Sequence, residues 1–87
     1  MFRIVSELSA SDGAVLKLAG RLDGDHIDSL VQERQRYQNR RLTLDLNDLR
    51  DLDATGLTLL RAWVREGVAL RGGSPFILLL LKRHSVL

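Results

Sequence analysis

The sequence predicts an α/β domain with a four-stranded mixed sheet and about three helices, in the order β-β-α-β-α-β-α. Residues 41–46 alternate apolar and polar side chains, as a half-buried strand requires. Leu57, Leu60 and Val64 then recur at helical spacing. The N-terminal end has the pattern of a β-hairpin. With 87 residues, the chain is expected to form a single domain over residues 1–87.

The first half of the chain predicts a hairpin and a helix. Residues 2–8 alternate loosely and residues 14–19 alternate clearly. The segment between them, Ser-Ala-Ser-Asp-Gly, has the composition of a turn. A helix is expected to begin near Asp25, because Ile27, Leu30 and Val31 form one apolar stripe. It is expected to end near Asn39.

The second half predicts a loop, a short strand and a last helix. Residues 51–56, DLDATG, are expected to form a small polar loop before the helix that ends at residues 66–67. Residues 68–71 are expected to form a short buried strand. Ser74 and Pro75 suit the N-cap and the first position of a helix over residues 76–83. Six consecutive apolar residues show no period, so a strand over residues 76–82 remains the alternative.

The composition excludes several classes of protein. Hydrophobic residues make up 45% of the chain and charged residues 28%, which is typical of a globular domain. The net charge of +2 is too small to indicate nucleic-acid binding. The absence of cysteine excludes disulfides, thiol catalysis and thiolate metal sites. No apolar run is long enough for a membrane span and no signal-peptide pattern is present, so a cytoplasmic protein is expected.

No pattern of catalytic residues can be assembled. The sequence contains no nucleotide-binding fingerprint and no nucleophile with a base at motif spacing. Seven aspartates between residues 23 and 53 do not have the spacing of a metal ligand set, and aspartate is common at turns and caps. His26 and His84 are expected at the surface. We therefore expect no catalytic residue, no metal and no cofactor.

Two short motifs resemble a known family. Residues 20–23, Gly-Arg-Leu-Asp, and residues 53–57, Asp-Ala-Thr-Gly-Leu, are similar to the G-x-L-D and D-S/T-x-G-L motifs of the STAS family (sulfate transporter and anti-sigma factor antagonist). The resemblance covers about residues 3 to 72 and implies a STAS-like fold. Members of this family are not enzymes. It therefore implies a non-catalytic regulatory module in a partner-switching pathway that binds an anti-sigma factor or serine kinase, or alternatively a cytoplasmic subunit that docks on a membrane transporter.

The resemblance also implies where a partner would bind. The partner-binding loop would consist of Asp23, Asp51, Asp53, Ala54, Thr55 and Gly56. Ala54 stands where the family places its phosphorylated serine or threonine, and alanine has no hydroxyl. Thr55 is therefore the candidate phosphosite, although it also suits a helix cap or first turn. Asp53 suits either a helix cap or a partner contact, and Asp23 a turn or cap.

Three further residues are candidates for an interface: Trp63, Leu78 and Leu79. Trp63 lies one position off the apolar stripe of its helix, so either core packing or a partly exposed anchor would fit. In a helix over residues 76–83, Leu78 and Leu79 cannot both face the sheet. Exposed leucines on a small domain suggest homodimerisation or partner docking. Asp45, between two leucines on a strand, needs solvent or an arginine partner.

Overall fold

The computed structural model describes residues 1–9 and 13–83 of the chain, so the predicted surface position of His84 lies outside it. The elements follow the predicted order, with one additional 3-10 turn, η1, before the first helix. They are β1 (Phe2–Leu8), β2 (Gly13–Leu22), η1 (Gly24–His26), α1 (Ile27–Gln35), β3 (Arg41–Leu52), α2 (Ala54–Arg65), β4 (Ala69–Arg71) and α3 (Pro75–Arg83).

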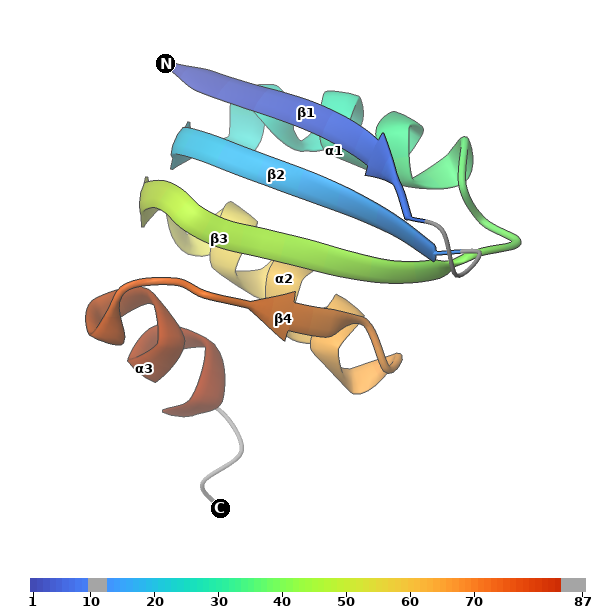
Figure 1. Ribbon diagram of the computed structural model, residues 1–87. Helices are drawn as coiled ribbons and strands as arrows, with labels where there is room; N and C mark the ends of the chain where they lie inside the picture. Colours follow the sequence, from blue (N-terminus) through green and yellow to red (C-terminus); the bar gives the residue numbers. More distant parts are fainter. Residues whose placement is uncertain (10–12, 84–87) are drawn as a thin grey trace.

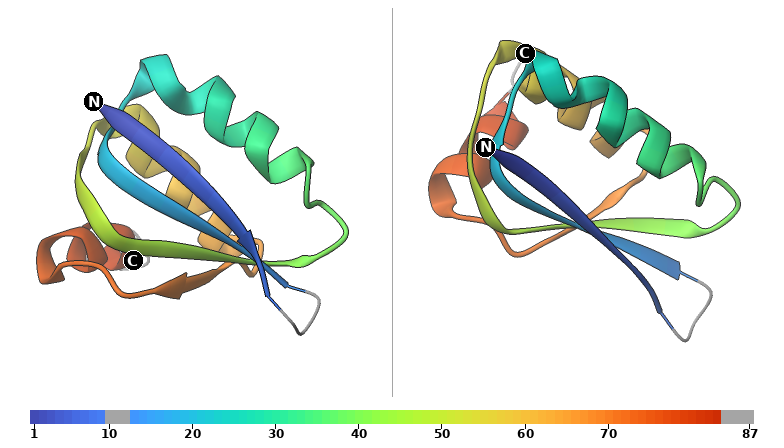
Figure 2. Two further views of the ribbon diagram at one scale, coloured as in Figure 1. Left: turned by 45° about the horizontal axis from the view of Figure 1, so that its top comes forward. Right: turned by 90° about the horizontal axis from the view of Figure 1, so that it is seen from above.

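The four strands form one mixed sheet in the order β1-β2-β3-β4 (Figure 1). β1 is antiparallel to β2, whereas β2 is parallel to β3 and β3 is parallel to β4. Helices α1 and α2 lie together on one face of the sheet, and α3 lies near its β4 end (Figures 1 and 2). Because β2 and β3 are parallel, both strands end at the same edge, and each is followed there by a helix start.

The core lies between the sheet and the helices and consists mainly of leucine. Its side chains come from the central strands and from all three helices. The largest fully buried residues are Leu16, Leu18, Leu22, Leu30, Leu44, Leu46, Leu60, Ile77 and Leu81. The predicted alternation along residues 42–46 is confirmed, because Leu44 and Leu46 are fully buried on one face of β3.

The predicted loop over residues 51–56 is wrong in its extent. β3 continues to Leu52, which pairs with Leu22 of β2 and is buried, so the apolar side chain holds the strand in the sheet. α2 begins at Ala54, which leaves Asp53 as the single residue between strand and helix. β2 runs to Leu22, three residues beyond the alternation seen over residues 14–19.

The buried side of α2 differs from the predicted stripe of Leu57, Leu60 and Val64. Its buried residues are Gly56, Leu60 and Trp63. Trp63 is 4% exposed, and the guanidinium carbon of Arg34 lies 4.8 Å from the centroid of its ring. Core packing therefore holds for Trp63, and its proposed role as an exposed interface residue is wrong.

The last segment is a helix, as favoured by the sequence, and not a strand. The Ser74 hydroxyl accepts a hydrogen bond from the Ile77 N–H at 3.2 Å, which caps α3 as predicted. Ile77 and Leu81 are buried, whereas Leu79 is 56% exposed and Leu78 is half-buried. Arg61 of α2 donates a 2.9 Å hydrogen bond to the Leu80 carbonyl and so links the two helices. No helix within residues 1–9 and 13–83 has the length and apolarity needed to cross a membrane.

Asp45 has the arginine partner that its place between two leucines requires. Its carboxylate accepts a hydrogen bond from the Asn47 N–H at 3.0 Å and another from the Arg71 guanidinium at 2.9 Å. The hydrogen bond from Asn47, followed by that from Arg71, lowers the pKa of Asp45 below its usual value of 3.8. A carboxyl with a lowered pKa stabilises the fold above its unfolded-state pKa and loses that contribution as the pH falls through the folded-state value.

We expect Asp45→Asn to lower the free energy of unfolding by about 1 kcal/mol at pH 7, because the amide keeps the shape but loses the charge-assisted bond to Arg71. The difference from wild type should shrink as the pH falls below 3.8, because the lowered pKa of the folded-state carboxyl places its protonation there. Urea unfolding at pH 7, 4 and 3 measures this change. Asp48→Asn, an exposed position on the same strand, is the control for the loss of one charge. A difference between Asp45→Asn and wild type that is independent of pH would contradict the assignment.

Candidate functional site

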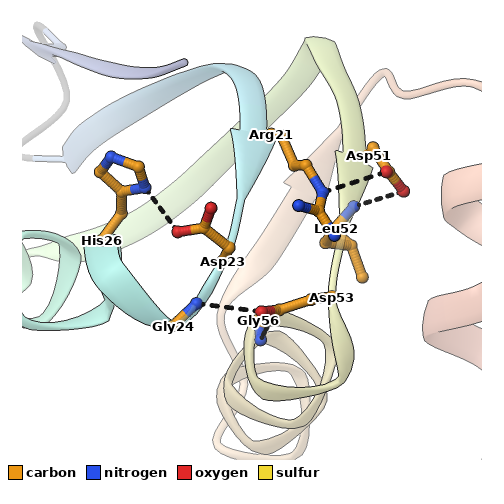
Figure 3. A network of polar contacts seen from close by, with 8 residues as sticks. All are labelled: Arg21, Asp23, Gly24, His26, Asp51, Leu52, Asp53 and Gly56. Atoms are coloured by element: carbon orange, nitrogen blue, oxygen red, sulfur yellow. Dashed lines mark hydrogen bonds and ion pairs between the residues drawn. The ribbon is translucent and has the colours of Figure 1, made fainter.

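The two motif segments meet at the edge of the sheet where β2 and β3 end. Leu22 and Leu52, the last residues of these strands, are paired. Each strand is followed by an aspartate, and a helical segment begins directly after it. Figure 3 shows the resulting network, in which residues 21–26 and residues 51–56 lie against each other. The structure therefore brings together the residues that the sequence assigned to one partner-binding loop.

Asp53 connects the two segments and caps α2. One carboxylate oxygen accepts a 2.8 Å hydrogen bond from the Gly56 N–H, and the other accepts a 3.0 Å hydrogen bond from the Gly24 N–H (Figure 3). The backbone N–H of Asp53 donates to the Leu22 carbonyl at 3.0 Å. The hydrogen bond from Gly56 is the main cause of a lowered pKa for Asp53. This carboxylate is therefore committed to holding two helix starts together.

Asp23 caps the neighbouring 3-10 turn, as its predicted role as a turn or cap residue requires. Its carboxylate accepts a 3.1 Å hydrogen bond from the Asp25 N–H. The same carboxylate lies 2.7 Å from Nδ1 of His26, as Figure 3 shows. The His26 ring lies against Phe2, with the ring centroids 5.3 Å apart. The histidine thus links the start of α1 to β1.

Asp51 belongs to the strand and not to a loop. It forms an ion pair with Arg21 of β2 at 3.2 Å, and its other oxygen accepts a hydrogen bond from the Leu52 N–H at 2.8 Å (Figure 3). Both side chains of the ion pair are about half exposed, so its contribution to stability is about 0–1 kcal/mol. Asp51 lies beside the motif segments without being part of the helix cap.

Two glycines of the motifs allow close packing. Gly20 has a φ of +88°, and a Cβ at this position would lie 2.0 Å from the Met1 carbonyl oxygen. A Cβ on Gly56 would lie 2.7 Å from the Leu22 carbonyl oxygen. Gly56 is buried, so its predicted place in an exposed partner-binding loop is wrong. Its role is to let α2 approach the end of β2.

The two motif residues between Asp53 and Gly56 are exposed. Ala54 and Thr55 form the first turn of α2, and both are exposed, whereas the helix is capped by Asp53. Together with Ile27, Thr58 and Leu59 they line a shallow, mainly apolar depression, which we call the α2 face. Thr58 and Leu59 are not among the site residues predicted from the sequence. The spacing of three and four residues from Thr55 places them on its side of the helix and could have identified them.

The carboxylates of Asp23, Asp51 and Asp53 are engaged with backbone N–H groups, an imidazole and a guanidinium. Within the part of the chain that the structure describes, no group of three or more His, Cys, Asp or Glu residues could hold a metal ion. The α2 face presents the exposed methyls and hydroxyls of Ala54, Thr55 and Thr58 beside the half-buried side chains of Ile27 and Leu59.

The architecture is that of a SpoIIAA-like domain. The solved structure of an uncharacterized protein of the DUF3478 family from Shewanella loihica PV-4, described as having a SpoIIAA-like fold, superimposes with a TM-score of 0.60. The alignment covers 86% of this chain and 69% of that chain at 18% sequence identity, so the likeness concerns the fold.

The family model described as "Mlab, STAS domain" matches residues 6–83, and the chain therefore belongs to the STAS domain family. This match confirms the family indicated by the two motifs, and the model reaches through α3, beyond the predicted limit near residue 72. No curated protein matches the chain.

Proposed function

We propose that this chain is a non-catalytic protein-binding module, similar to anti-sigma factor antagonists, that acts in a partner-switching pathway. It binds a protein partner of the anti-sigma factor or serine kinase class. The contact surface is the α2 face together with the exposed corner at Gly24 and Asp25, beside the cap made by Asp23 and Asp53.

The observation that carries this proposal is that some motif residues hold α2 in place while others are exposed. Asp53 and Gly56 are used to cap and pack α2, whereas Ala54 and Thr55 are directed outward. An exposed apolar and hydroxyl surface on a rigid helix start suits a protein partner, because its contacts are positioned before binding and cost little ordering entropy.

Ala54 determines how the binding is regulated. Phosphorylation at this position cannot occur, so the module binds its partner constitutively unless Thr55 takes over as phosphosite. A phosphate on Thr55 would add charge to the first turn of α2, close to the Asp53 carboxylate, and would change the surface that the partner meets. Incubation of the chain with its captured kinase partner and ATP, followed by mass spectrometry, should show one added phosphate on Thr55 if this residue is the switch. If Thr55 stays unmodified, phosphorylation does not regulate the module and it binds its partner constitutively.

Affinity capture with matched variants tests the binding surface. We expect wild-type protein to retain a kinase or anti-sigma factor that Thr58→Arg fails to retain, because a long charged side chain would stand on the α2 face. Gln35→Arg, an exposed position on α1 remote from this face, should retain the partner as wild type does. Titration of the purified partner should show an affinity at least tenfold weaker for Thr58→Arg. Equal binding of both variants would remove the α2 face from the proposal.

A second candidate function is a cytoplasmic subunit that docks on a membrane transport system. Phe76 and Leu79 of α3 favour it, because both large apolar side chains are 56% exposed on the same short helix. In this case Leu79→Asp should abolish capture of a transporter component and Thr58→Arg should leave it unchanged. The pair of variants therefore distinguishes the two functions.

A further inference from the structure

Strand β1 is an edge of the sheet with unpaired backbone groups. The Arg21 N–H donates to the Met1 carbonyl at 2.8 Å, and the Ser9 N–H donates to the Gly13 carbonyl at 2.8 Å. Hydrogen-bonded pairs alternate along an antiparallel ladder, so the odd-numbered residues of β1 bond to β2. The N–H and C=O groups of the even-numbered residues point away from the sheet: Phe2, Ile4, Ser6 and Leu8.

Within residues 1–9 and 13–83, no other element covers this edge. In the right-hand view of Figure 2, β1 runs across the front of the molecule without a ribbon over it. α1 lies to one side, and a groove lined by Phe2, Ile4, Ser29 and Gln32 separates its exposed side from β1. A strand of seven residues with a free backbone edge is a template for pairing with another strand.

The side chains of β1 are self-complementary about Val5. The Ser6 hydroxyl donates to the Glu33 carboxylate of α1, so even-numbered side chains lie on the helix side of the sheet and odd-numbered ones on the open side. On the open side Arg3, Val5 and Glu7 are all exposed. If a second β1 pairs antiparallel with Val5 facing Val5, each Arg3 faces the Glu7 of the other copy.

This register also satisfies the backbone and the remaining apolar side chains. Pairing about Val5 sets even-numbered residues opposite even-numbered residues, so the outward N–H and C=O groups meet in about eight hydrogen bonds. Phe2 of one copy then faces Leu8 of the other, and Leu8 is 58% exposed in the single chain. A shift of two residues in either direction would place Val5 opposite Arg3 or Glu7 and leave part of the strand unpaired.

We propose that β1 pairs with β1 of a second copy of this chain in this register, forming a two-fold dimer with one continuous eight-stranded sheet. Arg3 has no ion-pair partner among the described residues, and Glu7 pairs with Lys17 at 3.2 Å, where both side chains are about half exposed. The charges of Arg3 and Glu7 would disfavour pairing with unrelated strands, but they are complementary to those of a second copy. The α2 face remains open in such a dimer. Partner binding at the α2 face and dimerisation through β1 can therefore be tested independently.

Light scattering coupled to size-exclusion chromatography of the full chain, over a range of protein concentrations, should show a monomer–dimer equilibrium. Arg3→Glu makes both symmetric pairs of residues 3 and 7 acidic–acidic, and Glu7→Arg makes both pairs basic–basic. We expect each reversal to raise the dimer dissociation constant about tenfold or more. Both positions are exposed, so circular dichroism should show an unchanged fold.

Mixing the two variants is the decisive step. In a heterodimer of Arg3→Glu with Glu7→Arg, every acidic residue again faces a basic one, so the mixture should dimerise with about the wild-type affinity. The double variant Arg3→Glu/Glu7→Arg should also recover self-association. A loss of folding would not produce this recovery. Leu79→Asp on α3 serves as the control and should leave the dimer intact.

Three results would overturn the proposal. They are a strict monomer at several hundred micromolar, a dimer that neither charge reversal weakens, and two weakened variants that fail to associate when mixed. A dimer lost in Leu79→Asp and kept in both β1 variants would assign self-association to α3 instead.

Discussion

Ile77→Ala should lower the free energy of unfolding by about 2–5 kcal/mol. Ile77 is fully buried and belongs to the same core cluster as Leu44, Leu46 and Leu60. Alanine would remove three carbon atoms and leave a cavity between α3 and the rest of the core, because the surrounding side chains relax only in part. A domain of this size has a total stability of roughly 5–15 kcal/mol, so the variant would be close to unfolding.

Leu79→Ala is the matched control on the same helix. Its side chain is 56% exposed, so we expect a change within about 0.5 kcal/mol. Urea unfolding followed by the fluorescence of the buried Trp63 measures both variants. Two equally mild changes would mean that α3 is an appendage and not part of the core. The comparison also checks the direction in which the helix faces, which the unbroken apolar run left open.

The elements that the sequence predicted well are those with local signals. The alternation around Leu44 and Leu46 depends only on neighbouring residues, and so does the Ser74-Pro75 helix start. The same holds for the motif aspartate before α2, which acts through a backbone N–H three residues away. These features require no knowledge of the rest of the fold.

The features that the sequence did not predict depend on contacts between distant segments. Trp63 is buried because Arg34 of α1 and the sheet cover a ring that helical spacing alone places at the edge of the stripe. Asp51 and Leu52 remain in a strand because Leu52 pairs with Leu22, thirty positions earlier. In both contacts, Arg34 with Trp63 and Leu22 with Leu52, the two residues lie far apart in the sequence, so a local pattern cannot predict them.

The same distinction explains how the candidate site is built. In the motif, Asp53 and Gly56 hold α2 against the end of β2, whereas Ala54 and Thr55 face outward. The sequence assigned all of them to one exposed loop. A motif by itself does not distinguish the residues that hold the helix in place from the residues that are exposed on its surface. The contact of Gly56 with Leu22 is the part of this division that a substitution can test most directly.

Gly56→Ala should destabilise the domain by about 1–3 kcal/mol, although alanine has the higher helix propensity. The added Cβ would lie 2.7 Å from the Leu22 carbonyl oxygen and 2.9 Å from the Leu22 Cγ, so the backbone of β2 or α2 must move. That movement would also stretch the hydrogen bonds that Asp53 makes to Gly56 and Gly24. We therefore expect weaker partner binding at the α2 face together with the loss of stability. Urea unfolding and titration of the captured partner measure the two effects.

Gly24→Ala separates the contact with Leu22 from a general cost of replacing glycine. Gly24 lies in the facing segment of the same network, but the nearest atom to its added Cβ would be the Thr55 hydroxyl oxygen at 3.9 Å, an ordinary contact. We expect this variant to unfold within about 0.5 kcal/mol of wild type. Similar losses in both glycine variants would show that Gly56 is not specifically required for close packing. A stable Gly56→Ala would mean that α2 can leave the end of β2 at little cost, and the α2 face could then not be the preformed surface on which the proposed binding depends.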